Sequence, residues 1–280
     1  MKLPYIKMAL LPFVMATGLP GAASAATAPV SEIVVDARSG RVLYEAAGNR
    51  SRPPASLVKM MTLLLTFEAI DAGRLRSTGK VVMTPRGARQ PASRLGLAAG
   101  RTIGLDAAMR AVAVISANDV AVALAERVAG SEALFVQAMN RRARKLGMTA
   151  TRFTNATGLA PSGGLTTARD MATLARYIIS HHPVRYRIFS TPVIRWRGQV
   201  RPNHNHLLGK LRGVDGVKTG YTVPAGYNLA ASGRRGDKRV VVVVLGARSA
   251  AARDLLVSNL LESGFSSPRA TGQVSRRRSR

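Results

Sequence analysis

Hydrophobic and polar positions divide the chain into strand-like ends and a helical middle. Alternating residues at 31–36 and 41–45 flank a glycine-containing turn, a pattern that predicts a β-hairpin. Toward the other end, 214–222, 227–232 and 239–247 are strand-like, and the last contains five consecutive valines. A turn is expected at 233–236. These patterns favour one antiparallel sheet assembled from both ends of the chain.

The middle of the chain carries helical patterns. The run at 56–70 contains neither Gly nor Pro and predicts a mostly buried helix. Further helices are expected at 105–114, 118–128, 131–146 and 167–180, and an amphipathic one at about 250–263. Capping residues mark several ends: Ser131 and Thr166 or Thr167 at starts, Gly130 and Gly147 at stops. The combination predicts an α+β fold with a helical insertion.

The two termini differ from this folded region. Lys2 and Lys7 precede an apolar run at 8–19, and the small residues at 23–25 form a cleavage site, so we expect a signal peptide over 1–25 and an exported, periplasmic or cell-envelope protein. The apolar run is shorter than the about 20 residues that cross a bilayer, and no later stretch predicts a transmembrane segment. Residues 26–265 are expected to form the domain, and 266–280 a disordered basic tail.

Composition narrows the function classes. The chain has 280 residues, and 42 Lys and Arg against 14 Asp and Glu give a net charge of +28, which favours an anionic partner such as nucleic acid, lipid headgroups or an acidic polymer. A hydrophobic fraction of 46% argues against a wholly disordered chain. The absence of cysteine excludes disulfides, thiol nucleophiles and Cys-bound zinc.

Common hydrolytic motifs are absent from the sequence. There is no His-Glu-x-x-His zinc site, no Gly-x-Ser-x-Gly elbow and no P-loop. The four histidines lie within 181–206, beside no obvious nucleophilic serine, which argues against a Ser-His-Asp triad. A hydrolase with this sequence needs another general base.

Ser56-Leu-Val-Lys59 offers such a base. If Ser56 opens a helix, the i to i+3 spacing places the Lys59 amine on the same face as the hydroxyl. The helix start directs an N–H group and the positive dipole end to the place where an oxyanion would form. Lysine acts as a base when burial or a neighbouring cation lowers its pKa. The motif is weak alone, because Ser77-Thr-Gly-Lys80 repeats it in a loop.

Two further triplets allow both a structural and a functional interpretation. Ser116-Ala-Asn118 lies at an expected helix start, where it is either an N-cap or a hydroxyl that relays a proton beside an amide that binds substrate. Lys218-Thr219-Gly220 lies on an expected strand. It is either an edge-strand lysine or a cation and hydroxyl that hold a carboxylate, with Gly220 allowing a peptide to lie against the strand.

The three motifs, in this order, resemble the penicillin-recognising serine DD-peptidases, specifically the D-alanyl-D-alanine carboxypeptidases. The resemblance extends beyond the triplets and covers about residues 30–265. Its further blocks include Pro54–Thr62, Ser116–Glu126, Phe135–Asn140, Leu146–Met148, Thr167–Ala172, Val214–Thr222 and Ala225–Leu229. It implies a β-lactamase/transpeptidase-like fold, in which helices flank the antiparallel sheet and an all-helical subdomain is inserted.

The resemblance also implies a site. It makes Ser56 the acylated nucleophile, Lys59 its general base, Ser116 and Asn118 the relay and orienting pair, Lys218 and Thr219 the carboxylate binders, and the N–H groups of Ser56 and Tyr221 the oxyanion hole. Substrates would be peptidoglycan stem peptides ending in D-Ala-D-Ala, and β-lactams would be covalent inhibitors. Neither a metal nor an organic cofactor is expected, and no nucleic-acid partner.

Several departures and alternatives accompany this hypothesis. Tyr221 stands where many members have His, and His204 stands where an Arg is common, with Arg248 as a candidate replacement. A class A β-lactamase is one alternative, but no acid lies in the window that would hold its deacylating Glu; the acids between Asn118 and Lys218 are Asp119, Glu126, Glu132, Asp170 and Asp215. A DD-endopeptidase that cuts crosslinks is the second. A polyanion-binding protein, recognised by steeply salt-dependent DNA binding without acylation, is the third.

Overall fold

A computed structural model describes residues 30–159 and 163–268 of the chain. The expected signal peptide at 1–25 lies outside these residues, as does the expected 266–280 tail from residue 269 onward, whereas Ser266 still belongs to the last helix. No helix within the described ranges has the length and apolar character needed to cross a membrane.

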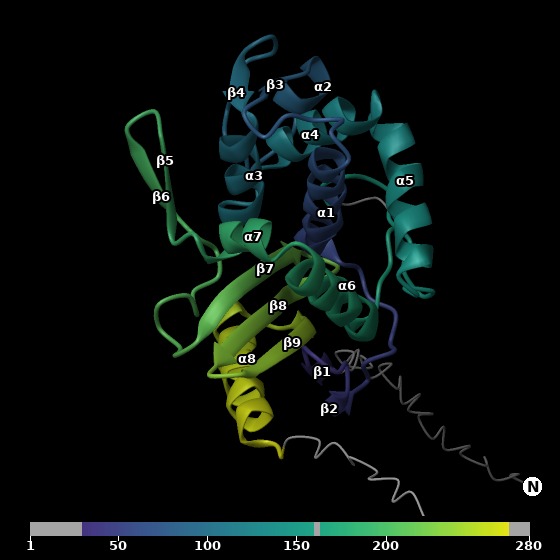
Figure 1. Cartoon of the computed structure of the whole chain (residues 1–280), viewed down its shortest axis with the longest axis vertical. Coiled ribbons are helices and arrows are strands. Elements are labelled where there is room, and N and C mark those ends of the chain that lie inside the picture. Colours follow the sequence, from purple (N-terminus) through teal and green to yellow (C-terminus); the bar gives the residue numbers. More distant parts are fainter. Residues whose placement is uncertain (1–29, 160–162, 269–280) are drawn as a thin grey trace, which may run out of the picture.

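A five-stranded antiparallel sheet forms the base of the structure (Figure 1). Its order is β2–β1–β9–β8–β7, so the first and last parts of the chain meet at its centre, where Val34 lies opposite Val242. The strands are β1 (Ser31–Asp36), β2 (Val42–Ala46), β7 (Val214–Thr222), β8 (Gly226–Arg235) and β9 (Lys238–Ala247). The expectation of a sheet built from both chain ends is confirmed.

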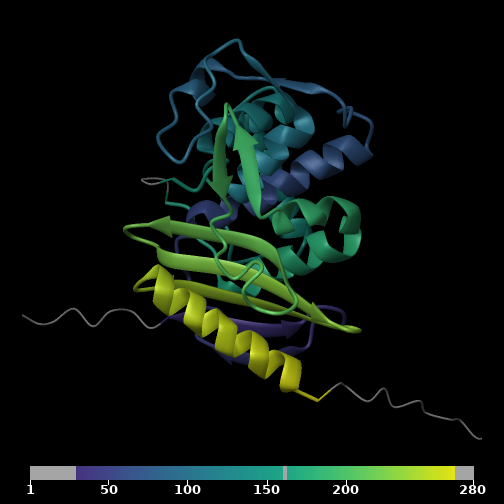
Figure 2. The ribbon, with the colours of Figure 1, turned by 90° about the vertical axis from the view of Figure 1, so that its left-hand side faces the viewer.

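Helices lie on both sides of this sheet (Figure 2). The longer ones are α1 (Val58–Asp71), α3 (Leu105–Val114), α4 (Asn118–Ala129), α5 (Glu132–Lys145), α6 (Ala168–His181) and α8 (Ala250–Ser266). The short ones are α2 (Pro85–Ala88), α7 (Pro183–Tyr186) and the 3₁₀ helices η1 (Ala55–Leu57) and η2 (Arg187–Ser190). The six long helices match those expected from the sequence within a few residues.

Local capping chemistry explains where several helices begin and end. The Ser131 hydroxyl accepts a hydrogen bond from Leu134 N, and the Thr167 hydroxyl accepts one from Asp170 N, so both residues are N-caps as predicted. Gly130 ends α4 with φ +82°, a conformation that glycine adopts without steric cost.

The valines of β9 explain why this strand is central. Val241 and Val243 pack in the large core shared with α1, α3, α4 and α6, whereas Val240, Val242 and Val244 pack in a second core with α8. Side chains alternate between the two faces of a strand, so a strand covered on both faces needs apolar residues at every position. The run of valines therefore indicates a strand that lies between two helical layers.

Some elements differ from the sequence expectations. The turn expected at 233–236 lies further on, because β8 continues to Arg235, which pairs with Lys238 and leaves Gly236 and Asp237 as a two-residue hairpin loop. The mostly helical region between β2 and β7, called the helical subdomain below, also contains short strands that were not expected from the sequence. These are β3 (Lys80–Val82) paired with β4 (Thr102–Gly104), and β5 (Val193–Trp196) paired with β6 (Gln199–Pro202). Strands of three or four residues are too short for a clear alternating pattern.

Candidate active site

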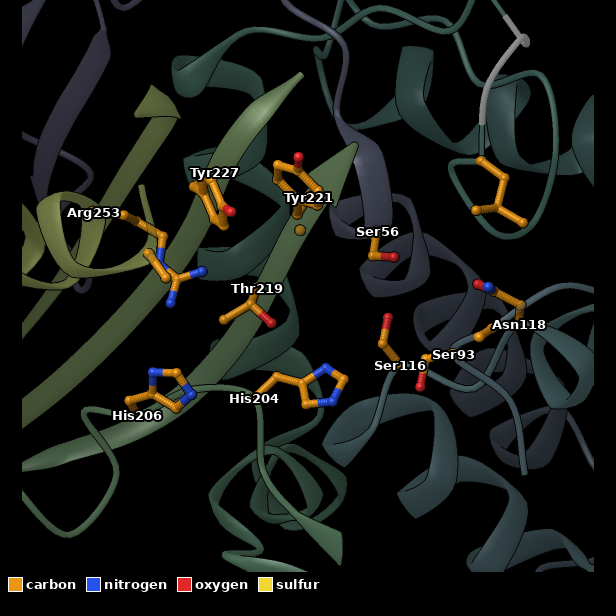
Figure 3. Close-up of a pocket in the computed structure, with 14 residues that line it drawn as sticks. Ser56, Ser93, Ser116, Asn118, His204, His206, Thr219, Tyr221, Tyr227 and Arg253 are labelled. Atoms are coloured by element: carbon orange, nitrogen blue, oxygen red, sulfur yellow. The ribbon is translucent and has the colours of Figure 1, made fainter. Parts of the chain in front are cut away.

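A cleft of about 380 Å³ lies between β7, an edge strand of the sheet, and the helical subdomain. Figure 3 looks into this cleft. Ser56, Ser93, Ser116 and Asn118 lie on its helical side, and Thr219, Tyr221, Tyr227 and Arg253 lie on the side of the sheet and α8. Three segments that are far apart in sequence, each carrying one predicted motif, therefore meet at one cleft.

Ser56 and Lys59 form the first contact of the site. Lys59 Nζ lies 2.9 Å from Ser56 Oγ and donates a second hydrogen bond of 2.7 Å to the carbonyl of Thr157. Ser56 belongs to η1, which runs directly into α1, so the serine and the lysine lie one helical turn apart, as the motif predicts. The second Ser-x-x-Lys sequence differs: Ser77 and Lys80 are exposed and line no part of this cleft.

Burial and a neighbouring charge change the chemistry of Lys59. The side chain is 0% exposed, and its burial, together with the positive charge of Lys218, holds the pKa of the Lys59 amine well below its ordinary value. A lysine with a depressed pKa is neutral in a larger fraction of molecules at neutral pH. Its nitrogen lone pair is then available to accept the Ser56 proton.

Close backbone packing fixes the turn that carries Ser56. A Cβ at Gly220 would lie 3.0 Å from Ser56 N, a contact tighter than most that a Cβ makes, so the absence of a side chain lets β7 approach this turn closely. The sequence predicts that Gly220 admits a substrate peptide, whereas in the structure its missing side chain makes room for the backbone of the Ser56 turn. The approach places the Ser56 N–H beside β7 at the residue before Tyr221.

Asn228 on β8 also holds this turn. The Asn228 amide is 0% exposed, and its Nδ2 donates to the carbonyls of Pro53 and Pro54 at 3.2 Å and 3.1 Å. Its Oδ1 accepts a hydrogen bond of 2.8 Å from Gly246 N. Asn228 therefore joins the segment before Ser56 to the central strands of the sheet.

Ser116 and Asn118 lie at the start of α4, opposite β7. Ala117, not Ser116, is the residue before the helix, and no side chain caps it, so the N-cap interpretation of Ser116 is wrong. Ser116 has φ +60°, an uncommon conformation for a residue with a Cβ, and its buried hydroxyl has no hydrogen-bond partner within the described residues. Figure 3 shows this hydroxyl directed toward Ser56.

The Asn118 amide is anchored on one side. Its Nδ2 donates a 3.0 Å hydrogen bond to the carbonyl of Pro91, while its buried Oδ1 has no partner among the described atoms. Asn118 lines the cleft, so this acceptor is placed for an N–H group of a ligand. Buried polar groups of this kind are rarely left without partners, which favours a binding role.

Cations gather where β7 meets α8. The Lys218 side chain is 1% exposed and donates to the carbonyl of Thr219, and its pKa is lowered to about 7 by burial and by the charge of Arg253. In the structure Lys218 lowers the pKa of Lys59, whereas Arg253 is the charge that lowers the pKa of Lys218.

Arg253 is a charged site residue that the sequence did not indicate. Its side chain is 4% exposed and lines the cleft from the first turn of α8. Arg248, the candidate proposed from sequence, is exposed and lines no part of the cleft, so that expectation is wrong. The repeated arginines of this basic chain gave no signal that would single out Arg253.

His204 does line the cleft, but its charge state differs from that of an arginine. Although the ring is exposed to the open cleft, its pKa is lowered to about 4 by partial burial and by the charges of Lys218 and Arg201. His204 is therefore neutral at pH 7 and adds no positive charge there. The positive charges near this end of the cleft are those of Arg253, whose guanidinium also pairs with Asp254 at 2.7 Å, and of the buried Lys218.

None of the described residues that line the cleft is acidic. The five acids between the second and third motifs are engaged in hydrogen bonds or ion pairs elsewhere: Asp119 with Leu95 N and Gly96 N, Glu126 and Glu132 with Arg86, Asp170 with Thr151, and Asp215 with Arg239. Within residues 30–159 and 163–268, no group of three or more His, Cys, Asp or Glu side chains is arranged to hold a metal ion.

Comparison with known proteins agrees with this arrangement. The family model described as D-alanyl-D-alanine carboxypeptidase matches residues 20–249. The chain is 35% identical over 244 residues to the D-alanyl-D-alanine carboxypeptidase DacF of Bacillus subtilis, covering 84% of this chain and 62% of that protein. It is 38% identical over 240 residues to DacC of Escherichia coli, covering 83% of this chain and 60% of the relative. The chain thus spans about three fifths of the length of these curated relatives.

Solved structures give the same result. Penicillin-binding protein 5 of Haemophilus influenzae superposes with a TM-score of 0.81 at 34% identity, covering 84% of this chain and 70% of that one. Penicillin-binding protein D2 of Listeria monocytogenes, in its cefotaxime-bound form, superposes with a TM-score of 0.77 at 34% identity, covering 84% of this chain and 96% of that one. The α+β fold expected from sequence is that of these neighbours. From the family match and these similarities, the chain belongs to the D-alanyl-D-alanine carboxypeptidase family.

Proposed function

We propose that the chain is a serine D-Ala-D-Ala carboxypeptidase, which removes the terminal D-Ala from peptidoglycan stem peptides through an acyl-enzyme on Ser56. The observation that carries this proposal is the 2.9 Å contact between Ser56 Oγ and the fully buried Lys59 Nζ, whose pKa is depressed. A serine beside a neutral amine is an activated nucleophile. β-Lactams would acylate the same serine.

Acylation begins with proton transfer. The neutral Lys59 amine takes the proton of the Ser56 hydroxyl, and Oγ attacks the carbonyl carbon of the D-Ala-D-Ala peptide bond. The tetrahedral oxyanion would be held by the N–H groups of Ser56 and Tyr221, and the close packing of Gly220 on Ser56 N supports this pairing. The C–N bond then breaks, and the proton held by Lys59 passes through the Ser116 hydroxyl to the leaving amine. Hydrolysis of the ester by water restores Ser56 and releases the shortened peptide.

Substrate binding uses the other motifs. An extended peptide can lie antiparallel to β7, because this strand is at the edge of the sheet. Its terminal carboxylate would meet Thr219 and Arg253, which line the cleft, and the neighbouring buried Lys218, whose protonated form adds a positive charge. The free Oδ1 of Asn118 would accept an N–H of the peptide on the opposite wall.

The cleft argues for slow release of penicillin. Class A β-lactamases use a Glu to position the deacylating water, and the described cleft lining contains no acid. The penicilloyl ester on Ser56 would therefore persist. The domain at 26–265 would act outside the cytoplasm after removal of the signal peptide at 1–25.

Release of D-Ala from purified muropeptides tests the proposal. The mature protein is incubated with a pentapeptide monomer and with a crosslinked dimer, and free D-Ala and monomer products are measured. We expect D-Ala from the monomer, no activity in Ser56→Ala, and unchanged activity in the matched control Ser77→Ala. Faster cleavage of the dimer would identify a DD-endopeptidase instead, and full activity in Ser56→Ala would contradict the assignment of the nucleophile.

A further inference from the structure

Two tyrosines form an aromatic pair at the mouth of the cleft. Tyr221 on β7 lies directly opposite Tyr227 on β8, and the two rings stack with centroids 4.2 Å apart at 30°. Both residues line the cleft that contains Ser56 (Figure 3). Cross-strand aromatic pairs of this kind hold both rings in fixed positions.

The Tyr221 ring keeps a large surface free for a ligand. Its side chain is 50% exposed, although its other face packs on Tyr227. Val223, one residue beyond the end of β7, is 86% exposed, so a second exposed apolar side chain follows Tyr221 in the chain. A rigid, half-exposed ring loses little conformational entropy when it binds a ligand, which makes it an effective contact surface.

The position of the pair along β7 identifies the part of the substrate that would meet it. Thr219 and Tyr221 are two residues apart and therefore lie on the same face of the strand, about 7 Å from one another. The terminal carboxylate of the substrate is proposed to bind at Thr219. A peptide antiparallel to β7 then runs from Thr219 past Ser56 toward Tyr221, so the residue before the D-Ala-D-Ala pair reaches the ring.

We propose that Tyr221 and Tyr227 form a subsite for the side chain of the residue that precedes D-Ala-D-Ala, and that this subsite selects large apolar or planar side chains over small ones. The inference rests on the proposed carboxypeptidase function. Covering one ring face removes about 50 Å² of apolar surface from water, which corresponds to about a tenfold preference in kcat/KM.

Synthetic tripeptides provide the test. N-acetyl-Gly-D-Ala-D-Ala and N-acetyl-Phe-D-Ala-D-Ala are compared by the rate of D-Ala release, and the ratio of their kcat/KM values is the readout. The ratio cancels any loss that affects both peptides, such as a change in the oxyanion hole. We expect a ratio of about ten in the unaltered protein, a ratio near one in Tyr221→Ala, and a retained ratio in Tyr221→Phe. Tyr44→Ala, which removes a tyrosine of similar exposure (44%) on β2, is the matched control and should leave the ratio unchanged.

The outcomes separate this inference from the function on which it rests. A ratio near one in the unaltered protein, or a ratio of ten that survives Tyr221→Ala, would overturn the subsite while leaving the carboxypeptidase intact. No D-Ala release from either peptide by the unaltered protein would contradict the proposed function, and the subsite with it.

Discussion

Replacing Gly220 with alanine tests whether β7 and the Ser56 turn work as one packed unit. The added Cβ would lie 3.0 Å from Ser56 N and 3.2 Å from both Leu57 N and the carbonyl oxygen of Pro54. Ordinary non-bonded contacts are about 3.5 Å, so the turn must move by about 0.5 Å. A displacement of about 1 Å at a reacting group lowers the reaction rate by about a hundredfold, so a displacement of about 0.5 Å should lower it by about tenfold. Overpacking of this kind also lowers the free energy of unfolding by about 1–3 kcal/mol.

The second-order rate of acylation by benzylpenicillin is the assay for this prediction. The matched control is Gly104→Ala at the end of β4, because a Cβ at Gly104 would meet no atom within 4 Å. We expect a rate about tenfold lower for Gly220→Ala and an unchanged rate for Gly104→Ala, with both proteins folded by circular dichroism. Acylation of Gly220→Ala at the unaltered rate would refute the argument that this contact positions the nucleophile.

The charges and hydrogen bonds of the site also determine its pH dependence and its stability. The pKa of Lys218 in the folded protein is about 7, and its protonated form binds carboxylate. We therefore expect KM for a D-Ala-D-Ala peptide to rise as the pH increases above about 7. A KM that is independent of pH from 6 to 9 would contradict this role. Arg253→Gln removes the charge that, together with burial, lowers the pKa of Lys218, so the rise in KM should begin at higher pH. KM at pH 6 should increase by about tenfold. An unchanged pH profile would show that Arg253 does not act on Lys218. Asn228→Ala leaves the Pro53 and Pro54 carbonyls without this donor and should lower the free energy of unfolding in urea by about 2–3 kcal/mol, whereas a change below about 0.5 kcal/mol would contradict its bridging role.

Much of the fold was predictable because its signals are local. A few neighbouring residues are enough to predict the buried strand β9 from its valines, and the caps at Ser131 and Thr167 from their side chains. The same holds for α1, whose sequence contains neither Gly nor Pro. The hairpins β3–β4 and β5–β6 were missed because three or four residues do not establish a period.

The site was predictable as three motifs, but their mutual contacts were not. The i to i+3 spacing predicts that Ser56 and Lys59 lie one helical turn apart, and in the structure Lys59 Nζ is 2.9 Å from Ser56 Oγ. The role of Asn228 depends on hydrogen bonds between residues more than 170 positions apart, and the burial of Arg253 depends on how α8 packs on the sheet. Such long-range effects arise only from the assembled fold.

The central claim is that Ser56 is the nucleophile, and mass spectrometry of the penicillin adduct tests it most directly. The mature protein and Ser56→Ala are mixed with benzylpenicillin, intact masses are followed over time, and any adduct is mapped by peptide digestion. We expect one long-lived adduct on the peptide that contains Ser56 and none in the variant. An adduct that persists in Ser56→Ala, or maps to another serine, would contradict the claim.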